Sequence, residues 1–225
     1  MPHDTATQTS TGGPRLAESK RTLVIVALLL AATGVAVFAE VQTPSCRTAL
    51  LVIDVQVAWL NSSAVTVDGV RIEQKTAQIV EAARPSDIPI VFIVDVSQRS
   101  LYSERRLSIA RPLEALDGDL VIEKTRPNGF ERTTLADDLR ARGVTTLLIT
   151  GLASQHCVQS TVDGALREGF EVIIVQDGHT GLQAGRVASS QNWRWERTGL
   201  QVVPSAEIDF AALCSPQTPP TRGTP

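Results

Sequence analysis

Two hydrophobic patterns alternate along the central part of the chain. Continuous apolar runs such as TALLVIDV, residues 48–55, are typical of strands that are buried on both faces of a sheet. Between such runs, apolar residues recur at helical spacing, as Ile72, Ile79 and Val80 do within residues 69–85. These patterns predict strands at 48–55, 88–96, 119–124, 144–151, 170–178 and 199–205, and helices at 69–85, 135–143, 157–169 and 206–214.

Strands that alternate with helices predict an α/β fold. We expect a doubly wound, mostly parallel six-stranded sheet with helices on both faces, which is a Rossmann-like arrangement of three layers. In such sheets a ligand binds beyond the carboxyl ends of the strands. The residues that follow those ends are Asp54, Gln56, Asp95, Lys124, the segment 151–157, Asp177 and His179. A carboxylate, a lysine and a cysteine are therefore predicted to meet at one edge of the sheet.

Both ends of the chain differ in composition from this central part. Residues 1–21 are polar and rich in threonine, serine and glycine, and residues 215–225 are rich in proline, so we expect both to be disordered. The folded domain is then predicted to span residues 47–214. That length is enough for one domain with a full hydrophobic core.

Residues 22–39 form an apolar segment that directly follows Lys20 and Arg21. Its length suits either a signal peptide or a membrane anchor. Val37 and Ala39 provide the small-residue pattern of a signal-peptide cleavage site, and without cleavage the segment would anchor the protein in the membrane. Both interpretations place the following domain outside the cytoplasm, in the periplasm or the medium. A buried core helix is the remaining interpretation, which the preceding basic residues disfavour.

Charge and histidine content narrow the classes of function. Lys and Arg total 21 against 24 Asp and Glu, which gives a formal net charge of −3 and a pI near 5.7. A nucleic-acid partner is not expected, because such proteins carry a basic surface. The three histidines, His3, His156 and His179, lack ligand-type spacing, so we expect no metal and no other cofactor.

Cys157 opens one of the predicted helices, and two interpretations of it are open. Backbone N–H groups and the helix dipole at this position favour a thiolate, so we expect the pKa of the thiol to be depressed. Many free cysteines are instead simply buried as small apolar residues. Asp54 and Lys124 favour the reactive interpretation. Charged groups at the ends of buried strands need partners, and such a pair could activate a nucleophile.

Three ordered motifs carry a resemblance to a known family. LLVIDVQVAW places an aromatic residue after an Asp-x-Gln, EKTRPNGFERTTL contains a lysine, and ITGLASQHCVQSTVDGALREGFEVIIVQDG contains a cysteine. In these motifs, and over about residues 49–207, the chain resembles the isochorismatase-like cysteine hydrolases. The residues that match are Asp54, Gln56, Trp59, Lys124, Phe130, Thr133, Leu135 and Cys157.

The resemblance implies hydrolysis of a C–N bond in a small amide or ureido compound through a thioester intermediate. Cys157 would be the nucleophile, Asp54 the general base and acid, and Lys124 the cation that lowers the thiol pKa and orients the aspartate. Family members also hold a non-proline cis peptide in the loop before the cysteine, which corresponds here to Leu152–Ala153. The N–H groups of Ala153 and Cys157 would then form an oxyanion hole.

The resemblance leaves the substrate open. Gln56, Trp59, Phe130 and His179 are the candidate substrate-binding residues, although Trp59 and Phe130 could equally pack in the core. His156 is adjacent to the cysteine along the helix and does not face it, which disfavours a role as its base. Members of the family commonly form dimers and larger assemblies, so a homo-oligomer is compatible with the resemblance.

Departures from the family pattern disfavour some activities, nicotinamidase activity among them, and leave others open. Residues 95–106 contain no histidine, whereas nicotinamidases of the family carry metal-binding histidines there. Isochorismatases proper lack the cysteine, which disfavours vinyl-ether hydrolysis. The alternatives that remain are hydrolysis of another bond by the same three residues, a catalytically silent binding domain of this fold, and a redox-sensing thiol protein.

Cys46 and Cys214 border the predicted domain, away from the strand ends that carry the chemistry. In an exported chain they would meet an oxidising compartment, where disulfides persist. A bond between them is the one pairing of the three cysteines that leaves Cys157 free. Two unrelated thiols are the alternative, because both cysteines lie next to the terminal segments.

Overall fold

The computed structural model describes residues 47–60, 69–181 and 186–214. Contacts within the chain divide it into two units, residues 1–41 and 42–225, and every described residue belongs to the second unit. The segments predicted to be disordered and the apolar segment 22–39 lie outside the described residues. Among the helices of the described ranges, none is both long and apolar enough to cross a membrane.

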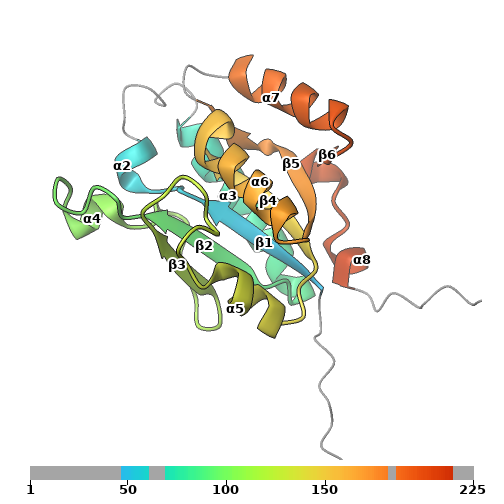
Figure 1. Cartoon of the computed structure of the whole chain (residues 1–225), viewed down its shortest axis with the longest axis horizontal. Coiled ribbons are helices and arrows are strands. Elements are labelled where there is room, and N and C mark those ends of the chain that lie inside the picture. The colour runs from blue at the N-terminus through green and yellow to red at the C-terminus, as the bar shows by residue number, and fades with distance from the viewer. Residues whose placement is uncertain (1–46, 61–68, 182–185, 215–225) are drawn as a thin grey trace, which may run out of the picture. The chain divides into compact units, whose positions relative to one another are not determined.

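Six parallel strands form one sheet in the order β3-β2-β1-β4-β5-β6 (Figure 1). Their bounds are β1 Thr48–Ile53, β2 Ile90–Asp95, β3 Leu120–Lys124, β4 Thr146–Leu152, β5 Glu171–Thr180 and β6 Gln201–Val203. The predicted doubly wound α/β fold is thereby confirmed. The strand order reverses between β1 and β4, which is the point where sheets of this kind bind ligands.

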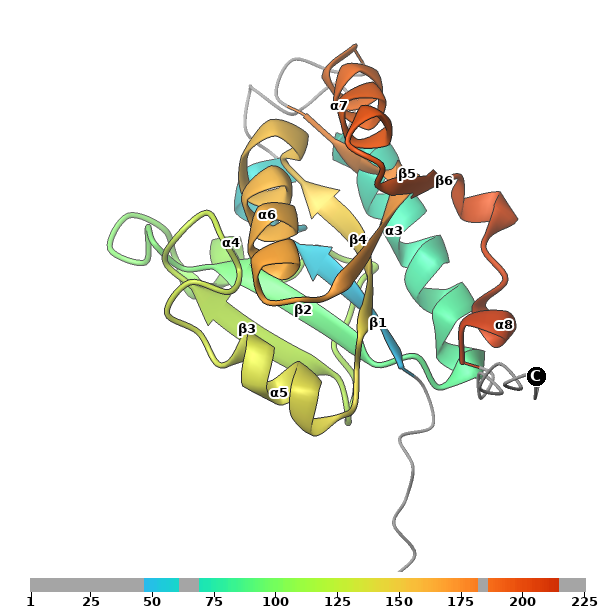
Figure 2. The same ribbon diagram turned by 45° about the vertical axis from the view of Figure 1, so that its right-hand side comes forward.

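Helices cover both faces of the sheet (Figure 2). Their bounds are α2 Val57–Leu60, α3 Gly69–Ala83, α4 Glu104–Leu107, α5 Leu135–Ala141, α6 Gln159–Arg167, α7 Arg186–Arg197 and α8 Phe210–Cys214. Buried apolar residues of α3 and α8 belong to one hydrophobic core cluster, whereas those of α5 and α6, together with Trp195 of α7, belong to the other. The three predicted layers are therefore present.

Strand β1 shows why the sequence pattern of this sheet is continuous rather than alternating. Leu50 and Val52 lie in the core cluster on one face, and Ala49, Leu51 and Ile53 lie in the cluster on the opposite face. All six residues of the strand are buried. A central parallel strand with helices on both sides has no solvent-facing positions, so apolar or small side chains are favoured at every position along it.

Two predicted helices have different bounds in the structure. A π-helical turn, η2 Ser154–Val158, precedes α6, so Cys157 lies in this wider turn rather than in the helix itself. The helix predicted at 206–214 is divided into a 3₁₀ turn, η3 Ser205–Glu207, and the short helix α8. Asp209 causes that division, because its carboxylate accepts the N–H of Ala212 at 3.0 Å and so caps the start of α8.

Helix α7 was not predicted. Its buried face consists of Ala188, Gln191, Asn192 and Trp195, which are spaced as expected for one side of a helix. Two of the four are polar, so the apolar periodicity that indicates a helix is missing. The hydrogen bonds that make these polar side chains acceptable in the interior come from distant parts of the chain.

Gly151 allows β4 and β1 to approach closely at their carboxyl ends. Its φ is +124°, and a Cβ atom at this position would lie 2.1 Å from the carbonyl oxygen of Ile53. Beside it the β4–β5 pairing is irregular, since β5 advances from Ile174 to His179 while β4 advances only from Ile149 to Gly151. This irregularity brings His179 level with the loop that carries Cys157.

Two of the three cysteines lie within the described residues, and their sulfur atoms are in different states. Cys157 is a free thiol, and Cys214 is disulfide-bonded. Cys46, the partner predicted for Cys214, lies outside the described residues. The pairing of Cys46 with Cys214 therefore stays a prediction.

Candidate active site

Three elements bring Asp54, Lys124 and Cys157 together at the carboxyl edge of the sheet. Asp54 directly follows β1, Lys124 is the last residue of β3, and Cys157 lies in the turn η2 after β4. The Nζ atom of Lys124 is 2.9 Å from Oδ2 of Asp54 and 3.4 Å from Sγ of Cys157. The predicted convergence of a carboxylate, a lysine and a cysteine is thus present in the structure.

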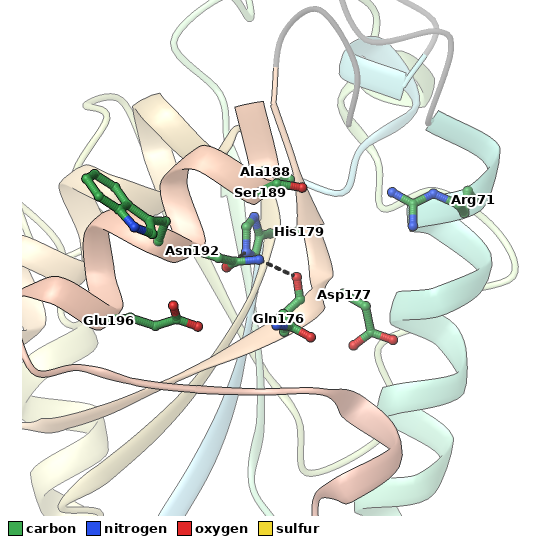
Figure 3. Close-up of a pocket in the computed structure, with 9 residues that line it drawn as sticks. Arg71, Gln176, Asp177, His179, Ala188, Ser189, Asn192 and Glu196 are labelled. Atoms are coloured by element: carbon green, nitrogen blue, oxygen red, sulfur yellow. Dashed lines mark hydrogen bonds between the residues drawn. The ribbon is translucent and has the colours of Figure 1, made fainter. Parts of the chain in front are cut away.

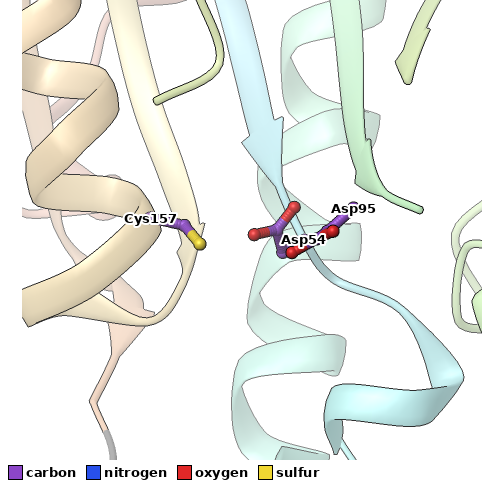
Figure 4. A group of neighbouring side chains, drawn as sticks. All are labelled: Asp54, Asp95 and Cys157. Carbon is purple, nitrogen blue, oxygen red and sulfur yellow. The ribbon is translucent and has the colours of Figure 1, made fainter. Parts of the chain in front are cut away.

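The ion pair between Asp54 and Lys124 is almost completely removed from solvent. The exposed fraction of the side chain is 0% for Lys124 and 5% for Asp54. Oδ2 of Asp54 bonds the lysine, while the buried Oδ1 has no hydrogen-bond partner among the described residues. Asp54 and Cys157 face each other (Figure 4), and a carboxylate oxygen of Asp54 lies within 4.8 Å of Sγ of Cys157.

Burial and the neighbouring charges set the protonation of these three groups. Burial raises the pKa of Asp54 to about 6, although the Lys124 ammonium and hydrogen bonds oppose the rise. Burial also lowers the pKa of Lys124, but the carboxylate of Asp54 and its other negative neighbours outweigh this, so the net shift is upward. At neutral pH Asp54 is therefore a carboxylate and Lys124 is an ammonium.

The expectation that the pKa of Cys157 is depressed is wrong. Burial is the largest influence, and with the nearby Asp54 carboxylate it raises the pKa of the thiol to about 12 despite the opposing effect of Lys124. The position of Cys157 near a helix start does not overcome these two effects. The resting site therefore holds a neutral thiol beside a carboxylate.

Asp95 is a third charged residue of the site. It ends β2 beside Lys124, and its Oδ2 lies 3.6 Å from the lysine Nζ. One ligand atom each from Asp54, Asp95 and Cys157 lie within 4.8 Å of one another, which is close enough to bind a metal ion (Figure 4). The Lys124 ammonium contacts all three side chains, so the positive charge beside these potential ligands comes from the lysine itself.

Gln56, a candidate substrate-binding residue, is fully buried and bonded to the protein. Its Oε1 accepts the backbone N–H of Asp95 at 2.8 Å and the indole N–H of Trp59 at 3.0 Å. Its Nε2 donates to the carbonyl oxygens of Asp95 and Leu107. These bonds place Gln56 where it orients Asp95, and a contact between Gln56 and substrate stays a prediction.

The two candidate aromatic residues have different surroundings. Trp59 is half-buried, packs against a core cluster and meets Tyr102 edge to face at 6.0 Å between ring centroids. Phe130 stacks on Phe170 at 5.7 Å, and Phe170 immediately precedes β5, at the end of the sheet opposite to the site. The structure therefore favours the core-packing interpretation for Phe130.

His179 is buried between β5 and α7. Its Nδ1 lies 2.8 Å from Oγ of Ser154, and its Nε2 lies 2.7 Å from Oδ1 of Asn192. With Asn192 and Gln176 it lines a cavity of about 500 Å³ (Figure 3). Both ring nitrogens are therefore engaged by the protein, and His179 as a substrate contact stays a prediction.

The peptide bond between Leu152 and Ala153 is cis, as the family resemblance implied.

The sequence did not single out Ser154 or Asn192 as residues of the region around His179. Ser154 lies inside the recognised cysteine motif, but nothing in its type distinguishes it from the neighbouring polar residues. Asn192 lies on the helix that was not predicted.

Comparison with known proteins identifies the family. A model of the isochorismatase domain matches residues 48–203. The chain belongs to the isochorismatase family. This finding confirms the resemblance seen in the three motifs, and it confirms the interpretation of the chain as an enzyme of this hydrolase family.

The similarity to individual relatives is moderate or partial. The isochorismatase family protein YrdC of Bacillus subtilis is 27% identical over 135 residues, which are 58% of this chain and 72% of YrdC. Streptothricin hydrolase of Streptomyces noursei is 30% identical over 134 residues, 58% of this chain and 53% of that protein. Ureidoacrylate amidohydrolase RutB of Methylobacterium radiotolerans is 49% identical over 69 residues, 30% of this chain and 26% of that protein. This chain thus covers about half or less of the two named hydrolases.

Solved structures support the fold. A cysteine hydrolase from Pseudomonas syringae superimposes with a TM-score of 0.66 at 21% identity, covering 76% of this chain and 95% of that one. N-carbamoylsarcosine amidase from Thermoplasma acidophilum gives a TM-score of 0.64 at 24% identity, covering 72% and 99%.

Replacing Asp54 should make the thiol more reactive towards an alkylating reagent. In Asp54→Asn the carboxylate that raises the pKa of Cys157 is gone while the Lys124 ammonium remains, so the thiolate fraction should rise. We expect iodoacetamide to alkylate Cys157 at least about tenfold faster at pH 8, the effect of lowering a pKa by one unit. The measurement is the rate of mass increase of the intact protein.

Asp137→Asn is the matched control, because it makes the same chemical change on a side chain of α5 that is 91% exposed. Its alkylation rate should equal that of the wild type. Unchanged or slower alkylation of folded Asp54→Asn would contradict the conclusion that Asp54 holds the thiol in its protonated form.

Proposed function

We propose that this protein is a cysteine amidohydrolase that cleaves a C–N bond of a small amide or ureido compound through a thioester. The observation that carries the proposal is the contact of one buried ammonium, that of Lys124, with both the Asp54 carboxylate and the Cys157 sulfur. Nucleophile, base and cation lie within contact distance at the strand ends where ligands bind in this fold.

The first half of the reaction transfers the acyl group to the enzyme. Because the resting thiol is neutral, Cys157 loses its proton to the carboxylate of Asp54 as the sulfur attacks the substrate carbonyl carbon. The proton on Asp54 then passes to the leaving nitrogen as the C–N bond breaks. Ammonia or an amine departs, and a thioester to Cys157 remains.

The second half returns the enzyme to its resting state. Asp54, again a carboxylate, takes a proton from a water molecule that attacks the thioester carbonyl. The C–S bond breaks, the carboxylic or carbamic acid leaves, and the sulfur regains its proton from Asp54. Lys124 stays protonated throughout and stabilises whichever partner carries the negative charge.

The turn that carries the cysteine is suited to hold the negative oxygen of each tetrahedral intermediate. We propose the backbone N–H groups of Ala153 and Cys157 as the oxyanion hole. Their place in the chain supports this assignment, because Ala153 directly precedes the turn η2 that contains Cys157, at the carboxyl end of β4. Preorganised N–H donors of this kind act strongly in a site that excludes water.

The names of the relatives support an amide or ureido substrate. Two of the hydrolases that the chain partly matches are named for action on streptothricin and on ureidoacrylate. A redox-sensing role is less well supported, because oxidation is favoured by a low thiol pKa, whereas that of Cys157 is raised.

We also propose that the protein is exported. The apolar segment 22–39 supports export, either as a cleaved signal peptide or as a membrane anchor. The disulfide bond of Cys214 supports it independently, since such bonds persist in oxidising compartments. Export would expose the enzyme to substrates of the periplasm or the medium.

Turnover of an amide panel tests the enzymatic proposal. Primary amides, N-carbamoyl compounds and lactams are incubated with the wild type, and release of ammonia or amine is measured. We expect at least one class to be hydrolysed, and Cys157→Ala to lower kcat at least about a thousandfold, as loss of a nucleophile does. The Tm of the variant should stay close to that of the wild type.

Two outcomes of this experiment would contradict the proposal. Hydrolysis that persists in Cys157→Ala would exclude the thioester route. Binding of panel amides by the wild type without any turnover would instead indicate a catalytically silent binding domain.

Counting thiols tests the proposed disulfide and export together. The full chain is expressed in a host that can export it, isolated from the periplasm or medium, and unfolded without reductant. We expect one free thiol, which belongs to Cys157, because Cys46 and Cys214 are bonded. Three free thiols would refute the disulfide, and recovery of the protein only from the cytoplasm would refute export.

A further inference from the structure

His179 has the environment of a positioning residue rather than of a substrate contact. Its side chain is buried, with an exposed fraction of 1% for the residue, and the indole of Trp195 meets the ring at 5.1 Å in an edge-to-face arrangement. Ser154 and Asn192 occupy its two nitrogens (Figure 3 shows Asn192 beside it). Neither nitrogen is left over for a ligand.

The hydrogen-bond network determines which nitrogen carries the proton. Nδ2 of Asn192 donates to the carbonyl oxygen of Gln176 at 3.0 Å, so the amide oxygen of Asn192 faces His179. An amide oxygen can only accept, so Nε2 of His179 carries the hydrogen. Nδ1 is then an acceptor, and it receives the hydroxyl hydrogen of Ser154.

The charge state of the ring agrees with this assignment. Burial lowers the pKa of His179 to about 4, although the bond to Asn192 opposes the shift. The imidazole is therefore neutral at physiological pH. A neutral ring is what an acceptor at Nδ1 requires, since both nitrogens of an imidazolium are donors.

Ser154 connects this network to the catalytic cysteine. It follows Ala153 directly, begins the turn η2 that contains Cys157, and is completely buried. Its hydroxyl is tied to β5 through His179, and β5 is tied to α7 through Asn192. Gln159, the first residue of α6 directly after this turn, makes a second contact with α7 through Gln191.

We propose that His179 acts through Ser154 to hold the turn that presents the N–H groups of Ala153 and Cys157 to the substrate oxygen. The proposal rests on the proposed function, because it concerns the oxyanion hole of that reaction. Asn192 fixes the tautomer, His179 accepts from Ser154, and Ser154 holds the turn. Acylation of the enzyme should depend on this chain, whereas simple reactivity of the thiol should not.

Two substitutions of His179 separate this role from packing. Asparagine places an acceptor roughly where histidine has Nδ1, so His179→Asn can keep the bond to Ser154. Glutamine places its amide roughly where histidine has Nε2, so His179→Gln can keep the bond to Asn192 and loses the one to Ser154. If the ring only fills space, the larger glutamine should be tolerated better.

Two reactions of Cys157 provide the readout without a known substrate. Acylation by 4-nitrophenyl acetate passes through a tetrahedral intermediate and uses the oxyanion hole, and it is followed as a burst of 4-nitrophenol. Alkylation by iodoacetamide forms no such intermediate. Cys157→Ala, which should show no burst, defines the background.

We expect His179→Gln and Ser154→Ala to slow the acylation burst about ten- to a hundredfold, as misplacement of a catalytic group does. Their alkylation rates should stay within about twofold of the wild type, and combining the two substitutions should add little, because both remove the same hydrogen bond. His179→Asn should acylate faster than His179→Gln.

Other outcomes would overturn the inference. If His179→Asn is slower than His179→Gln, the ring acts by packing. If folded His179→Gln and Ser154→Ala acylate as the wild type does, the turn does not depend on this bond. A wild type whose burst equals that of Cys157→Ala would instead contradict the proposed function, so the two failures are distinguishable.

Discussion

The site depends on one buried ion pair, between Asp54 and Lys124. Removing an ammonium and a carboxylate from water is costly, and only close mutual contact offsets the cost. At 2.9 Å and almost without solvent contact, the two charges stabilise each other. Loss of Lys124 would leave the Asp54 carboxylate buried and unpaired, at about 3–5 kcal/mol, whereas loss of Asp54 would leave Lys124 only the more distant carboxylate of Asp95. The ion pair fixes the ends of β1 and β3 relative to each other. It also sets the electrostatic environment in which Cys157 titrates.

Two groups of uncharged residues position the other functional residues of the site around the Asp54–Lys124 ion pair. On one side Gln56 bonds Asp95 and so secures the end of β2, next to Lys124. On the other side His179 bonds Ser154 and secures the turn that carries Cys157. Both supporting side chains are buried and have their polar atoms engaged by the protein. The charged residues thus perform the chemistry, while neutral amide and imidazole groups determine where they lie.

The sequence was sufficient for features that depend on a repeating pattern or on strand ends. The six strands followed from continuous apolar runs, and the rule for carboxyl ends of parallel strands selected Asp54, Lys124 and Cys157. Helix α7 was missed because Gln191 and Asn192 occupy half of its buried face, and their partners are distant in sequence. The raised pKa of Cys157 could not be foreseen either, since it depends on how far the sulfur is buried and on its distance from Asp54. Phe130 shows the same limit: its type suits a pocket wall or a core, and only its stacking on Phe170 favours the core.

The pH dependence of kcat/KM, measured on an amide that the protein hydrolyses, tests the central claim most directly. This quantity reports the ionisation of the free enzyme. If a neutral thiol reacts with the help of the Asp54 carboxylate, activity should rise with pH through about 6, where Asp54 loses its proton, and then remain level to about pH 9. A profile without this limb that instead rises through about pH 8.5, where an ordinary cysteine ionises, would show that a preformed thiolate is required and would contradict the account.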